Sequence, residues 1–197
     1  QKITTIDKRA LQNFISESPW NDDLFLKDIQ AEIVSLITEH SPNDDMALIG
    51  DESGFPKQGK ESVGVKRQYC GTLGKVDNCQ MGVFLAYSSK SQVSLIARSL
   101  YMPEEWCADK KRCDKVKVPE DKRKFKTKPQ LLMELIDQAV SNRVPFKFIS
   151  ADAGYDQPWF LDDLDSKGHF YVIDTAKDAL VHPGWPKMTA EEQEDGM

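Results

Sequence analysis

The sequence has few of the residues that build disulfide scaffolds, zinc sites or membrane spans. Its 197 residues include only four cysteines and three histidines, and no two cysteines form a CxxC pair. So few cysteines in a chain of this length do not make a disulfide scaffold and favour a reducing cytoplasm, and their spacing does not suit zinc. No apolar run reaches about 18 residues and no signal-like segment opens the chain, so neither a transmembrane helix nor a secretory signal is predicted.

The composition is that of a globular protein with an acidic balance. Hydrophobic residues make up 40% of the chain, charged residues 29%, and the formal net charge is −6. This length fits one domain of ordinary size that buries a real core. The acidic balance argues against a protein that is positively charged over its whole surface.

One stretch reverses the overall charge. Between Lys110 and Lys128 there are ten basic residues and only three acidic ones, a net charge of +7. A patch of this density attracts a polyanion, because neutralising phosphates gives salt-dependent affinity. Charge runs are also common in solvated loops. Both interpretations stay open from the sequence alone.

Hydrophobic spacing predicts three segments. Apolar residues three and four positions apart indicate a helical N-terminal segment over 1–45, interrupted near Pro19. A core is expected over 46–178, and a polar, acidic tail or the start of an insertion over 179–197. Within the core, strands are expected at 46–49, 63–70, 81–87, 93–101, 146–152 and 169–173, with helices from Lys128 and over 158–164. Clustered strands followed by alternating helices and strands predict an α/β fold with a mixed sheet.

Two of the predicted strands end in an aspartate, Asp51 and Asp152. If these strands lie side by side in parallel, the carboxylates meet at the edge of the sheet where active sites of open α/β folds gather. Two convergent carboxylates can bind hard divalent cations, which can activate a water for attack on a phosphodiester. The alternative is that both are ordinary aspartates that follow a strand.

Longer blocks around both aspartates resemble the bacterial DDE-type insertion-sequence transposases. The stretches 49–60 and 62–65 look like the first catalytic block of that family, and Ser150-Ala151-Asp152-Ala153-Gly154-Tyr155 looks like the second. Even the segment 14–20 is similar to the part of the family that precedes the core. Between the two catalytic blocks, similar blocks follow in the family's order at 67–75, 78–80, 82–87, 100–106 and 127–129.

The resemblance implies an RNase H-like core that cleaves and transfers DNA strands at transposon ends. It maps the first two acidic ligands of the family onto Asp51 and Asp152, with Mg²⁺ as the cofactor and Mn²⁺ as a substitute. The implied partners are double-stranded DNA, both terminal inverted repeats and target, and a homo-oligomer assembled on paired ends. The implied location is the bacterial cytoplasm, at the nucleoid.

The third acidic ligand of the family, a Glu on a later helix, has no matching position. Glu191, Glu192 and Glu194 lie in the tail without the companion residues of the family motif. Members of the family also normally have more chain before the position that corresponds to Gln1. We therefore expect a fragment or degenerate copy that is catalytically incomplete, and the alternative is a non-catalytic DNA-binding or regulatory remnant. An aspartyl-phosphate phosphatase would need a second Asp where Ser53 stands.

Basic residues near these blocks are candidates for DNA contacts, although each could equally be a solubilising surface residue. The candidates are Lys57, Lys60, Lys66, Arg67, Lys122, Arg123 and Lys124. Glu52 should point to the face opposite Asp51 if its strand continues, and we interpret it as structural. Tyr155 and Asp156 are candidates for shaping the loop after Asp152.

Overall fold

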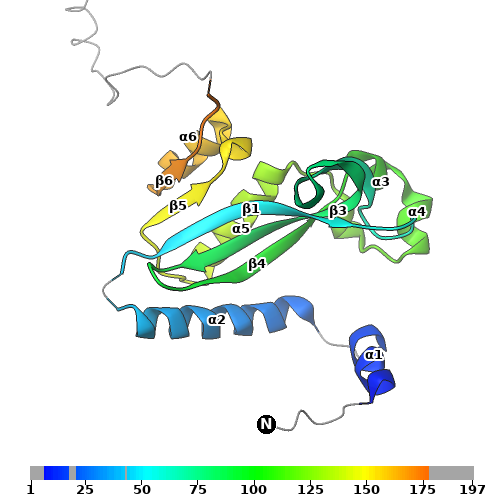
Figure 1. Cartoon of the computed structure of the whole chain (residues 1–197), viewed down its shortest axis with the longest axis horizontal. Coiled ribbons are helices and arrows are strands. Elements are labelled where there is room, and N and C mark those ends of the chain that lie inside the picture. Colours follow the sequence, from blue (N-terminus) through cyan, green and yellow to red (C-terminus); the bar gives the residue numbers. More distant parts are fainter. Residues whose placement is uncertain (1–6, 18–20, 43, 178–197) are drawn as a thin grey trace, which may run out of the picture.

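The computed structural model describes residues 7–17, 21–42 and 44–177. A mixed sheet forms its centre, with α3 and α4 at one end and β6 with α6 at the other (Figure 1). The helices are α1 (Lys8–Glu17), α2 (Asp22–His40), α3 (Glu104–Ala108), α4 (Lys110–Lys115), α5 (Lys128–Ser141) and α6 (Pro158–Ser166). The strands are β1 (Ala47–Pro56), β2 (Lys66–Cys70), β3 (Lys75–Ser88), β4 (Val93–Tyr101), β5 (Phe148–Ala151) and β6 (Phe170–Ile173).

The sheet has an antiparallel half and a parallel half. Its order is β2-β3-β1-β5-β6, and β4 also pairs with β3. β1, β2 and β4 all run antiparallel to β3, whereas β5 and β6 run parallel to β1. The α/β class with an RNase H-like mixed sheet is thereby confirmed.

Helix α5 covers the centre of the sheet because its sequence supplies both an N-terminal capping box and an apolar face. The Thr127 side chain accepts a hydrogen bond from the backbone N–H of Gln130, and Gln130 Oε1 accepts one from Thr127 N–H. The helix buries Leu131, Leu132, Met133, Leu135, Ile136 and Ala139 in the main core. Each large aliphatic side chain buried in this way contributes about 1.5–3 kcal/mol relative to exposure.

A glycine in β1 allows this close approach of α5. A Cβ atom at Gly50 would overlap the side chain of Leu132, which is completely buried. We therefore expect Gly50→Ala to lower the free energy of unfolding by about 1–3 kcal/mol, the usual cost of overpacking a core. Urea denaturation would measure the change, with Gly71→Ala as the control because a Cβ there meets nothing within 4 Å. Equal stability of the two variants would contradict this account of the packing.

Three predicted strand boundaries were wrong. β1 does not stop near Asp51 but continues to Pro56, because it pairs with β3 along its whole length, from Ala47 opposite Ser88 to Pro56 opposite Cys79. β2 begins at Lys66 and β3 at Lys75, so several residues expected in a turn belong to the hairpin. Backbone pairing extended β1 and β3 over residues without an apolar signal, whereas β2 is three residues shorter at its start than the predicted strand 63–70.

The segment before the core contains the two expected helices. α2 packs against β4, where Gln30 Nε2 donates a hydrogen bond to the carbonyl oxygen of Ile96. The predicted break near Pro19, the first six residues and the tail from residue 178 lie outside the described residues. The division into a helical segment, a core and a tail stays a prediction.

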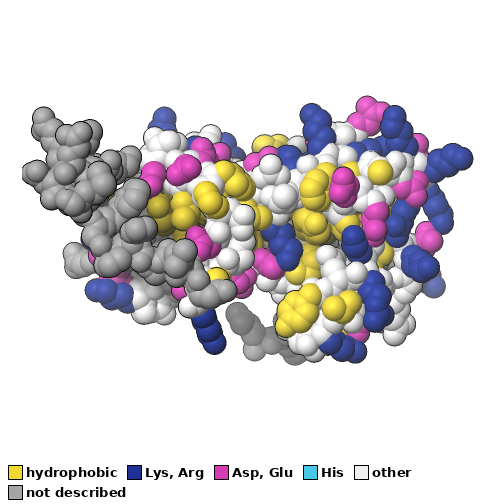
Figure 2. Space-filling model, turned by 90° about the horizontal axis from the view of Figure 1, so that it is seen from above, with side chains coloured by type: hydrophobic (Ala, Val, Ile, Leu, Met, Phe, Trp, Pro, Cys, Tyr) yellow, Lys and Arg dark blue, Asp and Glu magenta, His cyan; other side chains and the backbone are white. Residues whose placement is uncertain are grey.

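The basic segment between β4 and α5 is folded around a small core of its own. Trp106 is fully buried there with Val65, Met102, Cys113 and Val118. Its indole Nε1–H donates to the carbonyl oxygen of Val65 at 2.7 Å, which ties the segment to the chain before β2. Figure 2 shows lysine and arginine side chains gathered at this end of the molecule, where Figure 1 places α3 and α4.

Candidate active site

The register of the parallel strands β1 and β5 brings the two predicted aspartates together. Gly50 pairs with Ala151 at the last step of the β1–β5 ladder, so Asp51 and Asp152 are the next residues on each side. Asp152 directly follows β5, as the sequence predicted, whereas Asp51 lies inside β1 rather than at its end. Both carboxylates can therefore act on the same ligand.

Both aspartates line a groove of about 400 Å³. Its walls come from β1, from β2 and the turn after it, from β3 and from the first residue of α5. Besides the aspartates, the lining includes Tyr69, Thr72 and Lys128. Thr72 Oγ1 donates a hydrogen bond to the carbonyl oxygen of Gly54 at 2.5 Å, which holds the hairpin turn against β1. The groove is thus formed by segments that are distant in the sequence.

The electrostatics of the groove disfavour ionised Asp51. Partial burial raises the pKa of Asp51, and the negative charges of Asp152 and Glu52 raise it further. A 2.7 Å hydrogen bond from Glu52 N–H to Asp51 Oδ1, together with the positive charge of Lys128, opposes this shift. Asp152 Oδ1 accepts from Gly154 N–H at 2.9 Å and caps the turn Ala153–Tyr155. Positive charge placed between the aspartates would relieve their repulsion.

The sequence predicted that Glu52 points to the face opposite Asp51, but Glu52 lines the same groove as Asp51. Its Oε2 accepts a hydrogen bond from the Tyr155 hydroxyl at 2.8 Å, and its Oε1 lies 2.6 Å from Lys128 Nζ. Tyr155 also donates its backbone N–H to the carbonyl oxygen of Asp152 at 3.1 Å, within the loop that the sequence assigned to it. Asp156 accepts from the Thr175 hydroxyl at 2.6 Å. Lys128 belongs to the basic stretch and to the family-like block 127–129, but nothing in the sequence indicated that it reaches Glu52.

The predicted DNA-contact residues fall into two groups. Lys66 pairs with Glu105 at 3.4 Å, and Arg123 binds Asp114 and the carbonyl oxygen of Val118. Arg67 is exposed on β2. Like Arg67, four lysines form no ion pair within the described part of the chain, and they are Lys57, Lys60, Lys122 and Lys124.

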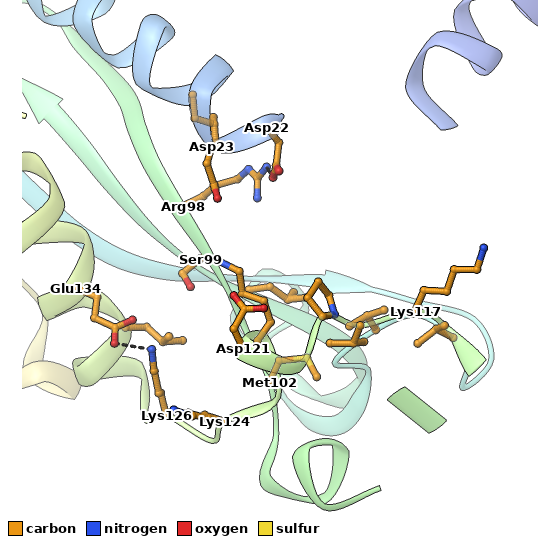
Figure 3. Close-up of a pocket in the computed structure, with 18 residues that line it drawn as sticks. Asp22, Asp23, Arg98, Ser99, Met102, Lys117, Asp121, Lys124, Lys126 and Glu134 are labelled. Carbon is orange, nitrogen blue, oxygen red and sulfur yellow. Dashed lines mark hydrogen bonds and ion pairs between the residues drawn. The ribbon is translucent and has the colours of Figure 1, made fainter. Parts of the chain in front are cut away.

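The free lysines lie in two places. Lys57 and Lys60 belong to the segment between β1 and β2, which Lys115 holds through a 2.6 Å ion pair with Glu61. Lys122 and Lys124 line a second groove of about 420 Å³. In Figure 3, Lys124 and Lys126 lie apart from Asp22, Asp23 and Arg98, which belong to the opposite wall.

The donor set at the first groove suits a hard divalent cation, since two adjacent carboxylates supply the oxygen ligands that such ions prefer. Counting only residues 7–17, 21–42 and 44–177, no group of three or more His, Cys, Asp or Glu side chains could hold a metal ion. Glu191, Glu192 and Glu194 lie outside these ranges. The described part of the site therefore provides two acidic ligands.

An RNase H-like sheet with paired aspartates beside a groove defines a candidate nuclease of the α/β class. The chain belongs to the DDE superfamily endonucleases, because the model of that family matches residues 4–197. This agrees with the resemblance to DDE-type insertion-sequence transposases, and enzymes of this superfamily generally use divalent metal ions.

A curated relative points in the same direction. The chain is 27% identical over 175 residues to a protein of Microchaete diplosiphon described as a probable transposase for insertion sequence element IS701. The aligned region covers 87% of this chain but only 42% of the relative, so the chain spans less than half of that protein. No solved structure gives a significant match. Across the described helices, none is long and apolar enough to cross a membrane.

Proposed function

We propose that this chain is part of the catalytic core of a DDE transposase, which cleaves and transfers DNA strands at transposon ends with a divalent metal. The observation that carries the proposal is the β1–β5 register, which sets Asp51 beside Asp152 at the edge of a groove. Membership of the DDE superfamily supports the same reaction class. The proposed partners are terminal inverted repeats, target DNA and further copies of the chain on paired ends, in the bacterial nucleoid.

Asp51 and Asp152 would hold Mg²⁺, and Mn²⁺ would substitute for it. An ion bound there supplies Lewis-acid stabilisation of the phosphodiester oxygens and a lower pKa for an attacking water. A metal ion binds the ionised form of Asp51, and the positive charge of Lys128 favours that form. We expect the chain alone to bind metal but to cut DNA poorly, because two aspartates supply only part of the acidic ligand set that the resemblance implies.

A manganese titration by calorimetry tests this function against the alternative of a non-catalytic remnant. Saturable binding of Mn²⁺ to the folded chain supports a catalytic core. A folded chain that binds duplex DNA but takes up no Mn²⁺ would instead identify a DNA-binding remnant. Circular dichroism at the titration temperature establishes that the chain is folded in both cases.

Four exposed lysines are proposed to contact the DNA backbone. We expect the pair Lys57→Ala and Lys60→Ala, and separately the pair Lys122→Ala and Lys124→Ala, to weaken duplex binding and flatten its salt dependence. Each phosphate contact contributes about −0.9 to the slope of log affinity against log salt concentration. Each double variant should therefore reduce the magnitude of the slope by about 1–2, as measured by fluorescence anisotropy over a range of salt concentrations.

The control is Lys167→Ala, because Lys167 on α6 is already paired with Asp137 and Asp163, both at 2.7 Å. This variant removes one positive charge without removing a proposed phosphate contact, so its slope should equal that of the wild type. A common slope for all variants would show that DNA is bound elsewhere on the protein.

A further inference from the structure

We propose that Glu52, Tyr155 and Lys128 form a clasp that fixes the position of Asp51 relative to Asp152. This inference rests on the proposed function, since it assigns positioning residues to the same metal site. It starts from a gap in the backbone pairing. The last paired residues of the β1–β5 ladder are Gly50 and Ala151, so the two aspartates lie just beyond the hydrogen bonds that join their strands.

The side chains of the clasp bridge this gap. Glu52 directly follows Asp51, and Tyr155 is the third residue after Asp152. The 2.8 Å hydrogen bond from the Tyr155 hydroxyl to Glu52 Oε2 therefore connects the two segments that carry the aspartates. The backbone pairing of β1 with β5 ends at Gly50 and Ala151, and this side-chain hydrogen bond joins the two segments beyond that point.

Tyr155 is a rigid member of the clasp. Its side chain is only 1% exposed and belongs to the main hydrophobic core, where its ring lies 6.2 Å from that of Phe160. Burial raises the pKa of Tyr155 far above its ordinary value, and the neighbouring carboxylates add to this shift. The phenol thus stays protonated and donates to Glu52 throughout the physiological pH range.

Lys128 joins a third element to the clasp. It is the first residue of α5, and its Nζ lies 2.6 Å from Glu52 Oε1. Both carboxylate oxygens of Glu52 are therefore occupied, one by a phenol and one by an ammonium group. Because each oxygen of Glu52 already binds a protein group, we assign Glu52 a positioning role rather than ligation.

Positioning of this kind has a measurable effect. Side chains that orient metal ligands without touching the metal typically change metal affinity about 10–100-fold when mutated. We therefore expect Tyr155→Phe, which removes only the hydroxyl, to weaken Mn²⁺ binding about 10–100-fold. Glu52→Ala should have a similar effect. Glu52→Gln should retain more affinity than Glu52→Ala, because its amide oxygen can still accept from Tyr155.

The matched control is Tyr171→Phe. Tyr171 donates its hydroxyl to Asp165 Oδ2 at 3.4 Å, away from the groove, so its loss should leave Mn²⁺ affinity unchanged. All titrations are run at a temperature where circular dichroism shows each variant to be folded. A purely structural role of Tyr155 would lower the melting temperature without changing affinity under those conditions.

A second measurement examines the clasp without metal. Hydrogen–deuterium exchange of peptides covering 49–54 and 150–157 should be faster in Tyr155→Phe than in the wild type and unchanged in Tyr171→Phe. Wild-type Mn²⁺ affinity in Tyr155→Phe would overturn the clasp while leaving the metal site intact. Failure of the folded wild type to bind Mn²⁺ would overturn the proposed site and the clasp together.

Discussion

Asp51→Asn and Asp152→Asn should each abolish saturable Mn²⁺ binding in a calorimetric titration. Both substitutions keep the size of the side chain but replace a charged oxygen ligand with a neutral amide, which hard cations bind far less well. The loss should exceed the roughly 100-fold effect at the upper end for residues that merely orient ligands. Because the two aspartates are neighbours in the β1–β5 register, either change alone should remove the site.

The stability of the metal-free variants provides the control. Burial raises the pKa of Asp51 above its ordinary value, so the stability present when Asp51 is protonated is lost as pH rises through the raised pKa. At neutral pH, Asp51→Asn removes this unfavourable ionisation, and we expect its melting temperature without metal to equal or exceed that of the wild type. Unchanged Mn²⁺ binding in both variants would mean that the metal site lies elsewhere.

Trp106→Ala should destabilise the protein by about 3–5 kcal/mol, the usual cost of emptying a large buried aromatic site. Trp106 is the largest side chain of the small core beneath the basic segment, and its indole N–H donates to the Val65 carbonyl oxygen. The guanidinium of Arg112 also lies 3.5 Å from the centre of its ring, a cation–π contact. Urea denaturation at neutral pH measures the loss.

The functional consequence of Trp106→Ala should be selective. The small core supports α4 and the turn Glu120–Arg123, which carry much of the basic segment, whereas Asp51 and Asp152 belong to the central sheet. Duplex binding should therefore become weaker while Mn²⁺ binding is retained. Trp159→Ala is the control, because Trp159 is 44% exposed and its removal should cost much less. Similar stability losses in the two variants would contradict a separate core around Trp106.

The order of the elements and the two aspartates of the candidate site could be predicted from the sequence. Helix α5 could be predicted because Lys128-Pro129 precedes a regular apolar spacing, and β5 because a short apolar run ends at Asp152. The continuation of β1 beyond Asp51 could not, because Glu52, Ser53 and Gly54 show no strand pattern. These residues are extended because β3 pairs with them.

The basic segment shows the same limit. The sequence shows its positive charge but does not separate a DNA-binding patch from a solvated loop. The fold of the segment depends on Val65, which is 41 residues before Trp106 in the chain. The structure also shows which basic side chains of this segment bind other protein groups and which line a groove. Arg123 is held by Asp114 and a backbone carbonyl, whereas Lys122 and Lys124 line a groove.

The periodicity of the elements, the density of charge and the two candidate aspartates can be recognised in the sequence, since each is a property of neighbouring residues. The contacts of these residues depend on the fold. Glu52 meets Lys128 across 76 residues and Tyr155 across 103. Such contacts depend on the order and register of the strands, which the whole chain fixes by pairing backbones and burying a common core.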